Sequence, residues 1–181
     1  KENCEEERLL GVSLTGIMDN NLTNGKADEA WRDDSLRGYA KTKMVLETLK
    51  NVAIETNKEW AEKIGIPQSV SVTCVKPSGT VSQLVDAASG IHARHNPYYI
   101  RTVRGDKKDP LTMMMRDVGF PCEDDVTKPD HTAIFSFPMK SPKNAIFRSD
   151  MTAIEQLELW KVYQRHWCEH KPSVTISVRE E

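Results

Sequence analysis

Short apolar runs alternate along the chain with longer stretches of helical periodicity. Small and apolar residues fill Leu10–Met18, and β-branched residues dominate Ser69–Val75, as in the buried strands of a parallel sheet. Thr132–Phe137 and Ser173–Val178 have the same character, whereas apolar and basic residues alternate in Tyr98–Arg104. The pattern therefore predicts four strands in one mainly parallel sheet and a further, half-exposed strand.

Two stretches predict long helices, because apolar side chains recur in them at intervals of three and four residues. The first is Ser35–Ile64, whose first residue suits the N-cap and which ends at a Gly-Ile-Pro sequence. The second is Met151–Cys168, with Asp150 as its expected cap. Pro110–Val118 predicts a shorter helix. Thr80–Leu84 fits either the start of another helix or an irregular stretch that continues through Gly90.

Long helices between short apolar strands indicate an α/β fold with a largely parallel sheet. The 181 residues are 38% apolar and 29% charged, which is typical of a globular protein, and they suffice for a single domain over residues 1–181. No apolar run approaches the roughly 20 residues that cross a bilayer, and the first residues are too charged for a secretory signal. We therefore expect a cytoplasmic protein, and both ends suggest a fragment of a longer chain.

Charge and cysteine content narrow the chemistry. A formal net charge of −2 argues against a general nucleic-acid binder, but it leaves room for a local anion site. The four cysteines are widely scattered and form no Cys-x-x-Cys pair. They are Cys4, Cys74, Cys122 and Cys168. This spacing predicts free thiols, with Cys74 buried in its strand, rather than a metal site or a disulfide scaffold.

The strongest candidate site is the turn that directly follows the strand Ser69–Val75. Its residues are Lys76, Pro77, Ser78, Gly79, Thr80, Val81 and Ser82. Ligands of α/β folds bind at the carboxyl ends of strands, and successive backbone N–H groups in a turn form an anion-binding concavity. Hydroxyls and a lysine charge would add donors, a helix start would add partial positive charge, and Gly79 would permit close approach or a positive φ. The pattern alone leaves an ordinary strand-to-helix turn equally open.

The order of several segments resembles that of the class II, cobalamin-dependent ribonucleotide reductases. In chain order these segments are Gly11–Asp19, Lys76–Ser82, Gly90–His92, Tyr98–Arg104, Asp109–Leu111 and Trp167–Ser177. They cover nearly the whole chain, and their combination is far more specific than the turn alone. The resemblance is closest to the monomeric ribonucleoside-triphosphate reductases.

The resemblance implies that the chain is the C-terminal part of a ten-stranded α/β barrel, in which Lys76–Ser82 cradles the substrate phosphates. It also implies an enzyme that reduces ribonucleoside triphosphates, or diphosphates, to deoxyribonucleotides by adenosylcobalamin-initiated thiyl radical chemistry. A thioredoxin-type reductant and the upstream barrel would be its partners, with no role for nucleic acid or membrane. His92, in the loop after the phosphate cradle, is a candidate to face substrate or cofactor, and a simple polar contact is the alternative.

The chain departs from that family in one respect. An Asn-Pro-Cys-Gly-Glu type of finger loop is expected before Leu10–Met18 and is not found, so we assign no catalytic residue and expect the fragment alone to be inactive. Cys4 lies in a Glu-rich stretch and is not interpreted as the radical cysteine. Two alternatives stay open, a non-catalytic nucleotide- or phosphate-binding module of the same barrel, and a glycyl-radical or di-iron reductase.

Overall fold

The computed structural model describes residues 2–25 and 39–178, which divide into two compact units. Unit 1 combines the first half of the chain, up to His95, with the segment from Pro142 onwards, and unit 2 is Asn96–Ser141. Each unit is described by itself below. The interpretation of residues 1–181 as a single domain remains a prediction.

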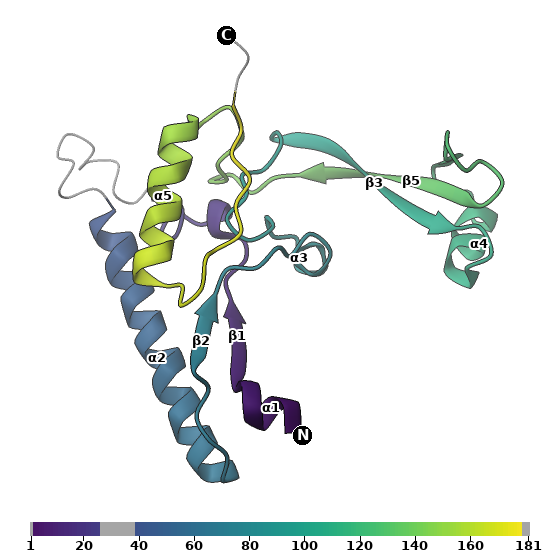
Figure 1. Cartoon of the computed structure of the whole chain (residues 1–181). Coiled ribbons are helices and arrows are strands. Elements are labelled where there is room, and N and C mark those ends of the chain that lie inside the picture. Colours follow the sequence, from purple (N-terminus) through teal and green to yellow (C-terminus); the bar gives the residue numbers. More distant parts are fainter. Residues whose placement is uncertain (1, 26–38, 179–181) are drawn as a thin grey trace. The chain divides into compact units, whose positions relative to one another are not determined.

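Unit 1 is built on a pair of parallel strands (Figure 1). After the short helix α1 (Glu2–Glu7), strand β1 (Leu9–Ser13) pairs with β2 (Ser71–Cys74), so that Ser13 lies opposite Cys74 at the carboxyl end. The chain crosses from β1 to β2 through a 3₁₀ turn η1 (Ile17–Asp19) and the long helix α2 (Ala40–Ile64). The α/β arrangement with parallel pairing is therefore confirmed.

The second long helix, α5 (Ala153–His166), packs against α2, and both helices begin or end with recognisable signals. Gly65, with a φ of 72°, ends α2 as predicted. Thr152 rather than Asp150 caps α5: its side chain accepts from the Glu155 amide, and the Glu155 carboxylate accepts from the Thr152 amide. Asp150 instead accepts from the Phe147 amide at 2.9 Å. The predicted Ser35 cap lies outside the described residues.

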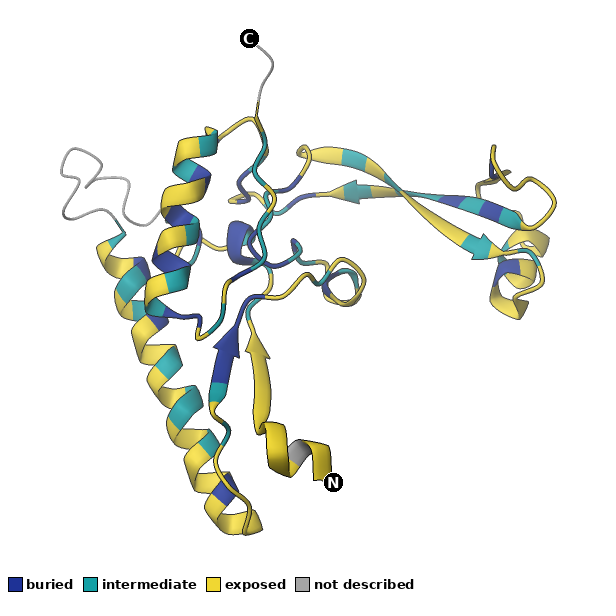
Figure 2. Ribbon diagram, in the orientation of Figure 1, coloured by how far each residue is buried: buried dark blue, intermediate teal, exposed yellow. Residues whose placement is uncertain are grey.

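The core of unit 1 lies between the strands and these helices (Figure 2). Its largest buried side chains include Tyr163 and Trp167 of the α5 region, Leu46 of α2 and Ile17 of η1. Two polar atoms in it are satisfied by backbone: the Tyr163 hydroxyl donates to Thr23 O at 2.9 Å, and the Trp167 indole donates to Cys74 O at 2.7 Å. Both bonds tie α5 to the segments that carry the strands.

The segment Ser173–Val178 does not form the predicted strand. The residues just before it nevertheless lie along β2, on the side that β1 does not occupy. The Glu169 amide donates to Thr73 O at 2.9 Å, and its carboxylate accepts from the Val72 and Thr73 amides at 2.6 and 2.8 Å. A side chain thus occupies donors that a regular ladder would use. Burial opposes the charge of Glu169, but the Thr73 and Val72 amides outweigh it and lower the pKa of the carboxyl.

Unit 2 is an antiparallel sheet with strand order β3-β5-β4, and one helix. Strands β3 (Tyr98–Asp106) and β5 (Thr132–Lys140) pair along nine residues, and β4 (Cys122–Asp124) pairs with the other edge of β5. Helix α4 (Pro110–Asp117) lies between β3 and β4 in the chain. The prediction of one mainly parallel sheet is therefore wrong for this part, because β5 finds its partners in neighbouring segments of the chain instead of pairing with β2.

A buried carboxylate organises the turn between β4 and β5. Asp125 is 4% exposed and accepts hydrogen bonds from the Thr127 hydroxyl and amide, the Lys128 amide and Arg104 Nε. These donors, the Thr127 hydroxyl first and Arg104 next, lower the pKa of Asp125 far below its ordinary value.

No helix of residues 2–25 and 39–178 is long and apolar enough to span a membrane.

We predict that unit 2 loses stability in acid through Asp125. A carboxyl whose pKa is lower in the folded than in the unfolded chain stabilises the fold above the unfolded pKa of about 3.9, and this contribution is lost as pH falls below it. Hydrogen exchange of the Thr127 and Lys128 amides, measured between pH 3 and 6, should accelerate at the acidic end beyond the chemical rate. In Asp125→Asn the same amides should exchange faster at every pH, without the acid-dependent step; an unchanged step would refute the assignment.

Candidate functional site

The predicted phosphate turn, residues 76–82, directly follows β2 and lies beside the carboxyl end of β1. Most of its residues are exposed, namely Lys76, Pro77, Gly79, Thr80 and Val81. Ser78 is half-buried and Ser82 is fully buried. The seven residues thus form one surface loop with a buried anchor at its end.

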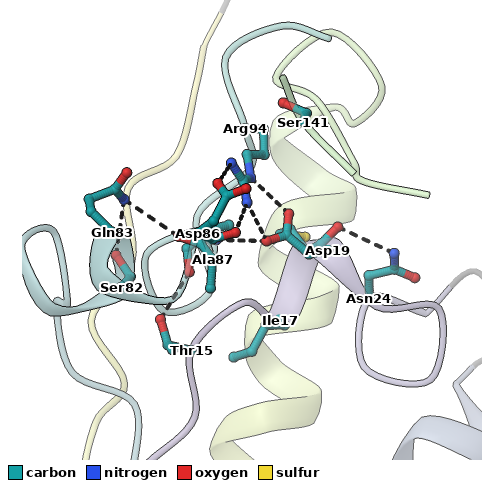
Figure 3. Close-up of polar contacts among 12 residues, drawn as sticks. Thr15, Ile17, Asp19, Asn24, Ser82, Gln83, Asp86, Ala87, Arg94 and Ser141 are labelled. Carbon is teal, nitrogen blue, oxygen red and sulfur yellow. Dashed lines mark hydrogen bonds and ion pairs between the residues drawn. The ribbon is translucent and has the colours of Figure 1, made fainter. Parts of the chain in front are cut away.

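The helix that follows the loop is a single turn, α3 (Val81–Leu84). It is too short to supply much of the partial positive charge that we expected from a helix start. The fold of the loop comes instead from Ser82, whose amide donates to Ser78 O at 2.8 Å and whose hydroxyl donates to the same oxygen. Gln83 Nε2 donates in turn to the Ser82 hydroxyl at 3.2 Å, as Figure 3 shows. Ser82 therefore shapes the loop from inside.

Two glycines of the region differ in what they permit. A Cβ built on Gly79 would meet no atom within 4 Å, and its φ is not in the left-handed region, so the possibility of a positive φ there is wrong. Gly90 has a φ of 52°, and a Cβ there would lie 3.1 Å from Lys76 O. Close packing against the start of the loop thus requires glycine at position 90, while position 79 leaves open space for a ligand.

Three hydroxyls meet beneath the loop. Thr15 Oγ1 lies 2.7 Å from Ser78 Oγ, and the Gly90 amide lies 3.0 Å from each of these two oxygens. The Ser78 amide donates to Ser89 Oγ at 3.1 Å. The Lys76 amide donates to Ser13 Oγ at 3.0 Å, at the end of β1. The loop backbone is therefore held by Ser13 at the end of β1 and by Ser89 in the segment that follows the loop.

A buried ion pair fixes the segment that returns from the loop (Figure 3). Arg94 donates from Nε and Nη2 to the two oxygens of Asp19 at 3.0 and 2.9 Å, and from Nη2 to Asp86 O at 2.6 Å. The Asp19 carboxylate also accepts from the Ala88 amide at 2.7 Å. The side chains of Arg94 and Asp19 are 4% and 12% exposed, so this fork-shaped pair is held in a low-dielectric environment.

Sequence reasoning missed the residues that build this arrangement. Asp19 and Thr15 are predicted only as part of the reductase-like segment Gly11–Asp19, and Arg94 has no predicted role. Asp19 and Arg94 are 75 residues apart in the chain, and the local pattern around each residue gives no signal of the other. His92 is half-buried and its amide donates to Ser89 O at 2.9 Å, so its assignment to a substrate or cofactor loop stays a prediction.

The cysteines of the described part of the chain are free thiols. Cys74 is buried in β2, as predicted, and Cys122 is exposed. Cys168 is buried beyond the end of α5, and burial raises the pKa of its thiol to about 12. The side chain of Cys4 lies outside the description. In residues 2–25 and 39–178, no group of three or more His, Cys, Asp or Glu side chains is arranged to hold a metal ion.

Comparison with solved structures defines the class of fold. The chain superimposes on a crystal structure of a B12-dependent, class II ribonucleotide reductase with a TM-score of 0.75 and 23% identity, over 97% of this chain and 26% of that one. The described fold therefore matches a segment of that reductase. No family model matches the chain.

Sequence comparison identifies particular relatives of the chain. The chain is 33% identical over 170 residues to the adenosylcobalamin-dependent ribonucleoside-triphosphate reductase of Euglena gracilis, covering 94% of this chain and 22% of the relative. It is 26% identical over 196 residues to the enzyme of that name from Lactobacillus leichmannii, covering 99% of this chain and 26% of the relative. The resemblance to this class is therefore confirmed, and the chain spans about a quarter of the length of these curated relatives.

We predict that Arg94→Met destabilises the protein by about 3–5 kcal/mol, because it leaves the Asp19 charge buried without its partner. Urea unfolding of the full-length protein, followed by tryptophan fluorescence, measures the loss. The double variant Asp19→Asn/Arg94→Met should recover part of it, since an asparagine oxygen still accepts from the Ala88 amide and carries no charge. Additive losses in the double variant would show that the pair is not coupled.

Proposed function

We propose that this chain is a segment of an adenosylcobalamin-dependent ribonucleoside-triphosphate reductase, in which residues 76–82 bind the substrate phosphates. The similarity to such reductases over 94% to 99% of the chain supports the activity. The position of the loop, at the carboxyl end of a parallel strand pair, supports the site. In the parent protein the segment would form part of the ten-stranded α/β barrel.

The loop offers a specific set of donors to a polyphosphate. Within the described residues, the Thr80 and Val81 amides donate to no protein acceptor. The exposed Thr80 hydroxyl and the Lys76 ammonium lie in the same loop. Hydrogen bonds to charged acceptors contribute about 1.5–3 kcal/mol each, so two or three of them account for micromolar to millimolar anchoring of a phosphate group.

This chain supplies binding rather than radical chemistry. In the parent, adenosylcobalamin would supply the radical that begins reduction at the ribose 2′-carbon, and a thioredoxin-type reductant would supply electrons in the cytoplasm. Within this segment, His92 stays the candidate for a contact with substrate or cofactor. The loop would hold the triphosphate so that the ribose is presented to catalytic residues on other segments of the barrel.

We predict that Gly79→Ala and Thr80→Ala each weaken binding of a ribonucleoside triphosphate to the full-length protein about tenfold or more. The first places a methyl group in the open space above the loop without meeting protein atoms, and the second removes a donor. Isothermal titration with the triphosphate and with the unphosphorylated nucleoside measures the effect.

Binding of the nucleoside should change little in these variants, because it never used the phosphate donors. Thr48→Ala, on the exposed face of α2, is the matched control and should bind both ligands normally. Equal losses for triphosphate and nucleoside would mean that the loop is structural. Normal triphosphate binding without turnover in the parent would favour a non-catalytic nucleotide-binding module.

A further inference from the structure

Thr15 lies outside the seven loop residues, two positions beyond the end of β1, and its side chain reaches under the loop. We propose that Thr15 is a positioning residue for the phosphate loop: its hydroxyl accepts a hydrogen bond from the Ser78 hydroxyl and so fixes Ser78 as part of the scaffold instead of a phosphate donor. The inference rests on the proposed phosphate-binding function.

The number of hydroxyl protons decides the direction of the bond between Thr15 and Ser78. A hydroxyl has one proton to donate and two lone pairs to accept with. The Thr15 hydroxyl donates to Ala88 O at 2.9 Å, an oxygen that can only accept. Thr15 therefore has no proton left for Ser78, and the short 2.7 Å contact between the two hydroxyls must use the proton of Ser78.

The alternative acceptor for Ser78 is weaker. Ser89 Oγ lies 3.5 Å from Ser78 Oγ, against 2.7 Å for Thr15 Oγ1. The Gly90 amide points at both Ser78 Oγ and Thr15 Oγ1, each at 3.0 Å, so it fills one lone pair on either oxygen. With these bonds Thr15 Oγ1 is saturated, and the Ser78 hydroxyl uses its one hydrogen-bond donor on Thr15.

The arrangement has a consequence for the ligand. The phosphate-facing donors are those of Thr80, Val81 and Lys76, while Ser78 and Thr15 set the backbone from which those donors project. Loss of either hydroxyl of the pair removes the same constraint. Their effects on triphosphate binding are therefore shared, whereas that of Thr80 is separate.

The test uses the full-length protein with a ribonucleoside triphosphate and its nucleoside as probes. Thr15→Val keeps the side-chain shape and removes the hydroxyl; it should weaken triphosphate binding about three- to tenfold, the equivalent of one neutral hydrogen bond, and leave nucleoside binding unchanged. Thr15→Ser restores the hydroxyl and should restore binding. Thr15 is exposed, so the fold should survive both changes.

Double variants separate this inference from the proposed function. Thr15→Val/Ser78→Ala should lose no more affinity than the worse single variant, whereas Thr15→Val/Thr80→Ala should lose the product of the two factors. Additive losses for Thr15 with Ser78, or normal binding by Thr15→Val while Thr80→Ala is impaired, would overturn the role of Thr15 alone. Normal triphosphate binding by both Gly79→Ala and Thr80→Ala would overturn the phosphate site, and this inference with it.

Discussion

The buried pair of Arg94 and Asp19 is the constraint on which the rest of unit 1 depends. A guanidinium and a carboxylate taken out of water are tolerated only when nearly all their hydrogen-bonding capacity is used. Here Arg94 holds Asp19 and the Asp86 carbonyl, and its backbone bridges Phe147. Three segments distant in sequence must therefore meet in one arrangement. The loop at residues 76–82 therefore runs between two held segments, β2 before it and the segment with Asp86 and Arg94 after it.

The loop itself is held by hydroxyls instead of by a helix. α3 is only one turn, so it cannot orient a phosphate through its dipole, and the residues between β2 and α3 form no regular element. Ser82 closes the loop from within, and Ser13 and Thr15 of the β1 end support it from the neighbouring strand. Short polar side chains do this well because they lose little conformational entropy on ordering. The outer surface of the loop stays open at Gly79.

Local patterns predicted those parts of the structure that depend on local interactions. The helical periodicity placed α2 and α5, and the β-branched run with its polar turn placed β2 and the candidate loop. The prediction of a single parallel sheet was wrong because the pattern of residues along a strand does not specify its partner. The pattern along β5 does not reveal that β3 will pair with it. Likewise Arg94 and Asp19 are 75 residues apart, and nothing in either segment alone indicates the other.

The parallel pair of β1 and β2 depends on contacts beyond the two strands. All five residues of β1 are exposed, including Leu9 and Val12, whereas β2 is buried between β1, α2 and the segment that follows α5. Two strands alone are marginally stable in water, so β1 depends on its contacts at the carboxyl end, where Ser13 and Thr15 bond to the loop. Strand pairing and loop geometry are therefore coupled, because the residues at the end of β1 also hold the loop.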